Sequence, residues 1–184
     1  MPRFIPMLIC IPMIGFAAIA QADQNDPRLD EMFARLQETD SRLEAQTLEQ
    51  NIWAIWFTSP NEEVNRLMDQ GSTAMNQGDM ATAIGAFSKI IEMAPEFAEG
   101  WNRRATALYM IGDFDGSRAD VAKTLALEPR HFGALSGLGL INAAEDKGEA
   151  AIEAWQKALE VNPNMPSVQQ NIEEMKAKLA DDNI

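Results

Sequence analysis

The residues most suggestive of chemistry lie in EPRHFGALSGLGLI, Glu128 to Ile141. This stretch holds the only histidine of the chain, His131, and three glycines follow it within eight residues. A phosphate-binding loop places its glycines before a helix, and a nucleophile turn needs glycine two residues on either side of the serine. Ser136 has Ala134 and Leu138 at those two places. Whether this stretch could be a phosphate-binding loop therefore depends on whether its glycines lie in a loop or inside a helix.

The sequence offers few residues that could bind a metal ion or act as reactive thiols. One histidine and one cysteine, Cys10, exclude the usual zinc sites and cysteine redox pairs. GDFDGSRAD, residues 112–120, resembles a calcium loop, but Gly116 is fourth rather than sixth and Thr124 stands where such a loop has its twelfth-place glutamate. We expect a turn with solvated acids at Asp113, Asp115 and Asp120. No catalytic residue, metal or cofactor is predicted.

The charge of the chain argues against polyanionic partners. Its 184 residues carry 15 Lys+Arg against 28 Asp+Glu, a formal net charge of -13. Such a field repels phosphate backbones and anionic lipid, so we expect no nucleic acid or membrane-surface binding. The length suits one domain, and 46% hydrophobic residues are too many for a disordered chain of this charge.

The first 22 residues have the pattern of an export signal. A short basic start, MPR, precedes an uncharged apolar run from Phe4 to Ala20, and cleavage is expected after Ala20 or Ala22. Pro6 and Pro12 interrupt the run, which is also short for a membrane span. We predict a periplasmic protein with no membrane span and no cysteine after cleavage. The alternative is an anchor formed by the uncleaved N-terminal segment.

An internal repeat organises the rest of the chain. Pro95, Pro129 and Pro163 are equally spaced along the sequence, and other positions keep their character at that 34-residue interval. Small residues recur in two columns and bulky ones in a third: Gly71, Ala105, Gly139; Ala83, Ser117, Ala151; and Phe87, Val121, Trp155. The pattern predicts three units, residues 64–97, 98–131 and 132–165.

Each unit has the chemistry of a helical hairpin. Apolar residues recur at steps of three and four, and QGD and IGD divide the first two units, with Asp79 and Asp113 placed to cap the second helix. The third unit reads AAEDKGEAA, which we expect to delay its turn to Lys147–Gly148. The glycines around Ser136 then lie inside a first helix, so no phosphate loop is predicted. Stacked hairpins give an all-α solenoid.

These units resemble the tetratricopeptide repeat (TPR) family. The 34-residue period, the order of small, bulky and proline positions and the mid-unit GD carry the resemblance over Val64 to Met165. Arg104 and Ser117 depart from the family pattern. AEGWNRRAT and LEPRHFGALSGLG are also similar to exported bacterial TPR proteins of poorly defined function. The resemblance implies a concave face, lined by the first helices, that binds peptide partners.

Two further segments flank the repeats. Residues 23–60 are predicted to form a degenerate helical hairpin whose aromatic residues, including Trp53 and Trp56, pack on the first full unit. Residues 166–184 are predicted to form a C-terminal capping helix and a tail, with Val168, Ile172, Met175 and Leu179 facing inwards. A solenoid needs such ends because its terminal faces are otherwise bare.

The leading function is a non-catalytic module that binds an extended segment of a cell-envelope protein in the concave groove. The alternative is a structural or oligomerisation role in which the hairpin around Trp53 and Trp56 docks on an assembly. Some chaperone-binding relatives clamp a terminal carboxylate with lysine and asparagine, but Met68 and Ser72 stand where that clamp begins. The predicted partner-binding residues are Asn102, Arg103, Thr106, Tyr109, Arg130, His131, Met68 and Met75.

A cluster of positive charge stands out in this acidic chain. Arg103, Arg104, Arg130 and His131 come together in the stacked arrangement, because the second and third units are neighbours. Two readings remain open at this point. The four residues form either an anion pocket for a partner's carboxylate or a set of structural ion pairs.

Overall fold

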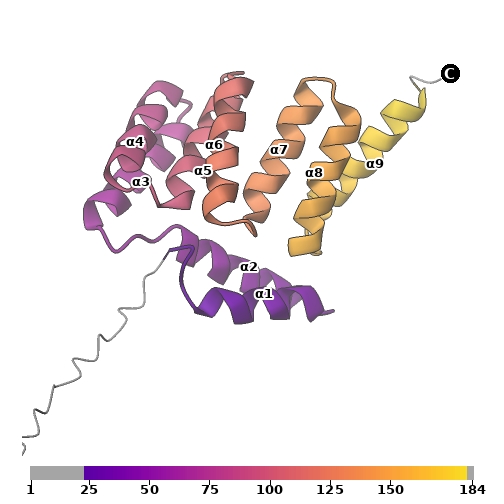
Figure 1. The fold of residues 1–184 in the computed structure, drawn as a ribbon, viewed down its shortest axis with the longest axis horizontal. Helices are drawn as coiled ribbons and strands as arrows, with labels where there is room; N and C mark the ends of the chain where they lie inside the picture. Colours follow the sequence, from indigo (N-terminus) through magenta and orange to yellow (C-terminus); the bar gives the residue numbers. More distant parts are fainter. Residues whose placement is uncertain (1–22, 182–184) are drawn as a thin grey trace, which may run out of the picture.

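A computed structural model describes residues 23–181, and that range contains nine α-helices and no strand (Figure 1). The predicted signal segment, residues 1–22, lies outside the described residues. The predicted all-α architecture is confirmed. The helices are α1 Arg28–Glu38, α2 Arg42–Trp56, α3 Glu62–Asn76, α4 Met80–Met93, α5 Ala98–Met110, α6 Phe114–Leu127, α7 Phe132–Ala144, α8 Gly148–Val161 and α9 Pro166–Asp181.

Helices α3 to α9 stand side by side in one row (Figure 1). Each unit supplies a pair, α3 with α4, α5 with α6 and α7 with α8, and α9 packs against α8. The predicted caps form, because Asp79 accepts a hydrogen bond from the Thr82 N–H at 3.0 Å and Asp113 accepts one from the Gly116 N–H at 2.9 Å. Each of these caps fixes where the second helix of its unit begins.

The third unit turns at the same place as the other two. Helices α4, α6 and α8 begin at Met80, Phe114 and Gly148, so the start of the second helix keeps the interval of the repeat. The left-handed residue of the turn is Gly78 at φ 79° and Gly112 at φ 80° in the first two units, and Asp146 at φ 57° in the third. The expectation of a delayed turn was therefore wrong. Aspartate tolerates this backbone conformation better than most side chains, so the turn survives without glycine.

The two helices of each unit cross at a small residue that faces a bulky one. A Cβ added at Gly71 would lie 2.5 Å from the Phe87 ring, and one added at Gly139 would overlap the Trp155 ring. In the second unit alanine replaces the glycine, and Ala105 packs against the smaller Val121. The columns are thus paired by volume: glycine where the partner is aromatic, alanine where it is valine.

The hairpin of α1 and α2 does not stack as a further repeat. It runs along one edge of the row, beneath α5 to α8 in Figure 1. The rings of Trp53 and Trp56 pack against His131 and Phe132, where the third unit begins, at centroid distances between 4.1 and 5.5 Å. The predicted packing of these tryptophans on the first full unit was wrong, because the hairpin's apolar side faces the links between units.

Polar contacts attach the hairpin at three successive links. The Gln24 amide donates to the Glu96 carbonyl at 2.5 Å and accepts from the Ala98 N–H at 3.2 Å. Asp30 forms an ion pair with Arg130 at 2.7 Å, and Gln37 donates to the Glu160 carbonyl at 3.0 Å. The hairpin therefore touches the start of the second unit, the start of the third unit and the end of the array.

Helix α9 covers the last repeat. Val168 and Ile172 are buried against Trp155 and Ala151, and Met175 packs beside them.

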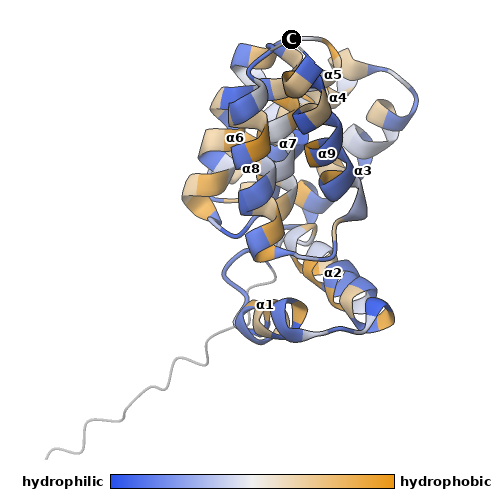
Figure 2. Cartoon of the chain, turned by 90° about the vertical axis from the view of Figure 1, so that its right-hand side faces the viewer, coloured by the Kyte–Doolittle hydropathy of each residue, from blue (hydrophilic) through white to orange (hydrophobic). Residues whose placement is uncertain are grey.

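Polar residues interrupt the apolar ones along every helix visible in Figure 2. Among the described residues, none of the helices combines the length and the apolar character needed to cross a membrane.

Candidate partner-binding groove

The side of the array formed by the first helices, called here the groove face, carries three successive hollows. The first hollow, about 590 Å³, lies between α3, α5 and the end of α2. The second, about 60 Å³, lies between α5 and α7, and the third, about 320 Å³, lies between α7, α8 and α9. Leu140 lines both the second and the third. An extended polypeptide that crossed the first helices would meet the three hollows in order.

The second hollow gathers several of the predicted binding residues. Its walls include Asn102, Thr106 and Tyr109 from α5, and Gly133, Gly137 and Leu140 from α7. Thr106 is exposed, and Leu140 is 36% exposed although it is apolar. Tyr109 is half-buried, with its ring 5.6 Å from that of Phe114. These side chains give the second hollow a mixed polar and apolar lining.

Gly137 opens this hollow. A Cβ added at Gly137 meets nothing within 4 Å, so the surface above this helix turn is free. Arg103 stands one repeat before Gly137 and Asp69 stands two repeats before it, which places the three in one column. Sequence reasoning missed this column, although the same spacing that revealed the fold also identifies it.

The first hollow is lined partly by the hairpin. Ala54, Phe57 and Thr58, at the end of α2, face Met68, Ser72 and Arg103 from the array. Arg103 is half-buried between the rings of Phe57 and Phe87, with its Cζ 5.1 and 5.9 Å from their centroids. Burial lowers the pKa of the Arg103 guanidinium from its ordinary value. Sequence reasoning missed the hairpin's part, since nothing in residues 54–58 indicates where that segment lies.

The predicted cluster of positive charge does not assemble into one pocket. Arg104, next to Arg103, makes two hydrogen bonds to Asp120, at 2.7 and 2.8 Å, and a third to Ser88 at 3.1 Å. Arg130 pairs with Glu128 and Asp30 and lies over the Phe33 ring at 4.5 Å. These carboxylates raise the pKa of both guanidinium groups. The structural reading holds for Arg104 and Arg130, and only Arg103 faces a hollow.

His131 is completely buried and serves the fold. Its Nδ1 accepts a hydrogen bond from the Ala134 N–H at 3.1 Å, which caps α7. Its Nε2 lies 2.9 Å from the Glu99 carboxylate, and its ring stacks on Trp56 at 4.1 Å between centroids. Because Nδ1 accepts, Nε2 carries the proton and donates to Glu99. The hairpin covers His131, so we withdraw it from the partner-binding residues.

The other predicted residues divide between lining and packing. Asn102 is 7% exposed and donates to Glu99 at 3.0 Å, so it supports the hollow that it lines. Met68 is 3% exposed and belongs to the core of the first unit, and Met75 packs against that core. Ser136 lies inside α7, where its backbone carbonyl accepts a hydrogen bond from the Trp155 indole N–H at 3.1 Å. Thr106, Tyr109 and Arg103 line the hollows with exposed or half-buried side chains, whereas the half-buried Met75 lines none of the three.

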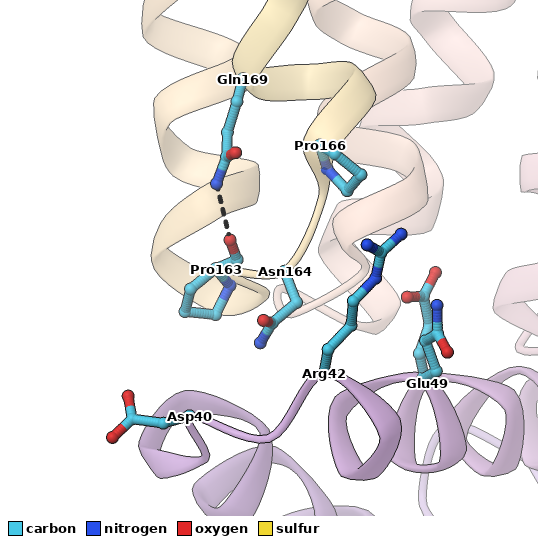
Figure 3. A pocket seen from close by; sticks show the side chains of 8 residues that line it. Asp40, Arg42, Glu49, Pro163, Asn164, Pro166 and Gln169 are labelled. Atoms are coloured by element: carbon cyan, nitrogen blue, oxygen red, sulfur yellow. Dashed lines mark hydrogen bonds between the residues drawn. The ribbon is translucent and has the colours of Figure 1, made fainter.

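A further hollow, of about 370 Å³, lies at the edge of the molecule and not on the groove face (Figure 3). The start of α2, with Arg42 and Glu49, faces the link between α8 and α9 there. Gln169 closes one side by donating to the Pro163 carbonyl at 3.0 Å. Its lining mixes polar side chains with Pro163 and Pro166 and includes none of the predicted partner-binding residues.

Comparison with known proteins identifies the array. The sequence pattern of the tetratricopeptide repeat family matches residues 68–123 and 105–166, which together span just over half of the chain. The chain belongs to the tetratricopeptide repeat family. A TPR repeat-containing protein of Rhizobium etli is 31% identical over 153 residues, or 83% of this chain and 75% of that protein.

Other relatives are matched over only part of their own length. The small glutamine-rich tetratricopeptide repeat-containing protein 2 of Mycosarcoma maydis is 29% identical over 118 residues. That match covers 64% of this chain but only 34% of the fungal protein. Among solved structures, the first TPR of Spaghetti (RPAP3), bound to the HSP90 peptide SRMEEVD, superposes with a TM-score of 0.62 at 24% identity, covering 65% of this chain and 94% of that one. This TPR chain therefore shares the fold of that domain.

Proposed function

We propose that this TPR protein is a non-catalytic binding module that holds an extended segment of a partner protein across its groove face. The observation that carries the proposal is the run of three hollows along α3, α5, α7 and α9. A helical array offers its partner a continuous surface, and a segment that lies across several repeats gains a little contact from each. The HSP90 peptide held by the first TPR of Spaghetti supports this mode of use.

The accessible side chains on the groove face suit such a segment. Thr106 and Ser72 supply hydroxyl groups, Tyr109 and Leu140 supply apolar surface, and the opening above Gly137 admits a main chain. Shallow, mixed surfaces of this kind bind extended peptides better than compact small molecules. We further propose that residues 1–22 direct export and that the partner is a protein of the cell envelope.

The hairpin suits a role within the molecule better than a docking role. Trp56 is 1% exposed and Trp53 is half-buried, both against the chain's own array. An assembly that docked through these rings would have to remove them from His131 and Phe132. We therefore propose no oligomer formed through the hairpin.

A glycine pair provides the test. Gly137 and Gly85 both lie inside helices, and a Cβ added at either meets nothing within 4 Å. Gly137 lies in the second hollow, whereas Gly85 is on α4 outside all three. Gly137→Leu should fill the hollow and abolish capture of the partner in a crosslinked pull-down from the cell envelope. Gly85→Leu should leave capture unchanged.

Both substitutions should leave the fold intact. Replacing glycine inside a helix favours the helix by up to about 1 kcal/mol, so thermal unfolding should shift slightly upwards in both variants. Equal capture by both variants, or no partner retained by the parent protein at physiological salt, would contradict the proposal. Loss of capture by both variants would point to a site elsewhere on the array.

A further inference from the structure

Arg103 is a half-buried cation without an acidic hydrogen-bond partner. Among its donors, Nη2 reaches the Ser72 hydroxyl at a long 3.3 Å, and Nε is buried with no partner at all. Glu99, on the same helix, acts on Arg103 only through space, and this effect is smaller than that of burial. Its Oε2 is committed to His131 and Asn102, and its buried Oε1 makes no hydrogen bond within the described residues. Within the described chain, Arg103 takes part in no ion pair, unlike the half-buried Arg104, Arg118 and Arg130.

Burial of the unpaired Arg103 guanidinium lowers the stability of the fold, whereas burial of the paired Arg104 guanidinium does not. A charge moved out of water is compensated only by a paired charge with well-formed hydrogen bonds. Arg104 has that compensation from Asp120, and its pKa is raised, whereas burial lowers the pKa of Arg103. Two aromatic rings hold the Arg103 guanidinium in place without neutralising it. An anion that entered the first hollow would supply the compensating negative charge that the fold does not provide for Arg103.

The walls of the first hollow limit what that anion is. Phe57 and Met68 are apolar, and Ser72 offers a hydroxyl beside the guanidinium. Asp69 is exposed on the same wall and forms no ion pair with Arg103. Its carboxylate repels any anion in the hollow, and this repulsion is greater for two negative charges than for one. The hollow therefore suits one carboxylate carried on an apolar stem.

We infer that the first hollow is a pocket for a single aspartate or glutamate side chain of the partner, bound by the Nη edge of Arg103. The inference rests on the proposed function. We assign a side chain and not a chain terminus because Phe57 and Met68 offer apolar surface to the methylene stem that only a side chain carries. Phe57 belongs to the hairpin, which makes this pocket a joint product of hairpin and array.

The first experiment uses small carboxylates and a resonance of Arg103 itself. The buried Nε–H of Arg103 should be observable by NMR and should shift when a carboxylate pairs with the Nη edge. N-acetyl-glutamate α-amide should give a saturable shift in the millimolar range, about the affinity that one charge-assisted pair supports. N-acetyl-glutamine α-amide should give none. A shift with N-acetyl-alanine alone would overturn the side-chain assignment in favour of a terminal carboxylate.

The second experiment compares adjacent arginines. Arg103→Met should remove carboxylate binding, followed through the amides of Phe57 and Ser72, and should leave thermal stability unchanged or raised. Arg104→Met should retain binding but lower the unfolding temperature, because Asp120 loses its partner. If Arg103→Met lowers stability as much as Arg104→Met, Arg103 is a structural residue and the inference is wrong.

Failure of this inference can be told apart from failure of the proposed function. If no carboxylate shifts Arg103 while Gly137→Leu still abolishes capture, the groove binds a partner without an acid at this place, and only the inference fails. If Arg103 binds glutamate but no partner is captured, the pocket stands and the proposed function falls.

Discussion

At the scale of single residues, His131 shows how a side chain that suggests catalysis is used by the fold. Its Nδ1 caps α7, its Nε2 bonds to the buried Glu99, and its ring stacks on Trp56. A partner or substrate in this conformation reaches none of these atoms, since the residue is 0% exposed. The same three contacts link α5, α7 and the hairpin at one point.

Glu99 and His131 should therefore be energetically coupled. His131→Phe keeps a ring against Trp56 but leaves the Glu99 carboxylate buried without its imidazole donor, and we expect it to lower the free energy of unfolding by about 2–4 kcal/mol. Adding Glu99→Leu removes the buried carboxyl group that has lost its donor and should recover part of that loss. Urea unfolding of both single variants and the double variant should give a coupling of about 1–3 kcal/mol. Additive losses would show that the pair does not act as a unit.

At the scale of helices, the pairs of small and bulky residues explain why the sequence predicted the units so directly. Gly71, Ala105 and Gly139 recur because each helix crossing permits only the volume that its partner leaves. The hairpin could not be placed in the same way. Its apolar stripe shows which side of the hairpin is buried but not what that side packs against, because any apolar surface of matching shape could cover it. Residues 23–60 also lack the spacing that relates the repeat units to one another.

The binding residues were predictable only in part, for a similar reason. The resemblance to the TPR family implied that the first helices line the groove, and helical spacing put Thr106 and Tyr109 on that face. Whether an arginine faces solvent, a carboxylate or a ring depends on its rotamer and its tertiary neighbours. Arg103 and Arg104 differ in this respect although they are adjacent in the chain.

The volume pairing can be tested by converting one crossing into another. Gly139→Ala should lower the free energy of unfolding by about 1–3 kcal/mol, because the added methyl group overlaps the Trp155 ring. Trp155→Val added to Gly139→Ala recreates the Ala105–Val121 pair of the second unit. The double variant should lose less than the sum of the two single changes in urea unfolding. A loss equal to that sum would mean that the columns vary independently.

The turn of the third unit gives a second test at this scale. Asp146 adopts the left-handed conformation that glycine adopts at residues 78 and 112. Asp146→Gly should stabilise the protein by about 0.5–1 kcal/mol, since a side chain is strained there and its ion pair with Lys178 is exposed. Gly112→Asp should destabilise by a similar amount, and thermal unfolding measures both. Destabilisation by Asp146→Gly, or stabilisation by Gly112→Asp, would mean that side-chain contacts outweigh backbone strain at this turn.

At the scale of the whole molecule, the hairpin makes this array different from a simple stack. In a solenoid each repeat contacts only its neighbours, so stability adds up locally and the ends unfold first. Here Gln24, just before α1, touches the link at residues 96–98, and α1 and α2 touch the links at residues 130–132 and 160–165. A crosswise element that joins three links couples units that otherwise do not touch, and it also supplies Phe57 to the first hollow.

Releasing the hairpin should therefore loosen all three links together. Trp56→Ala removes the ring that stacks on His131 and should cost about 3–5 kcal/mol. Hydrogen exchange measured by mass spectrometry should then show lower protection at residues 96–98, 130–132 and 160–165 at once, while α4 and α6 keep theirs. Carboxylate binding at Arg103 should weaken as well, because Phe57 leaves with the hairpin. Lower protection only near residue 131 would mean that Trp56 fills a local cavity and that the repeats hold their arrangement without the hairpin.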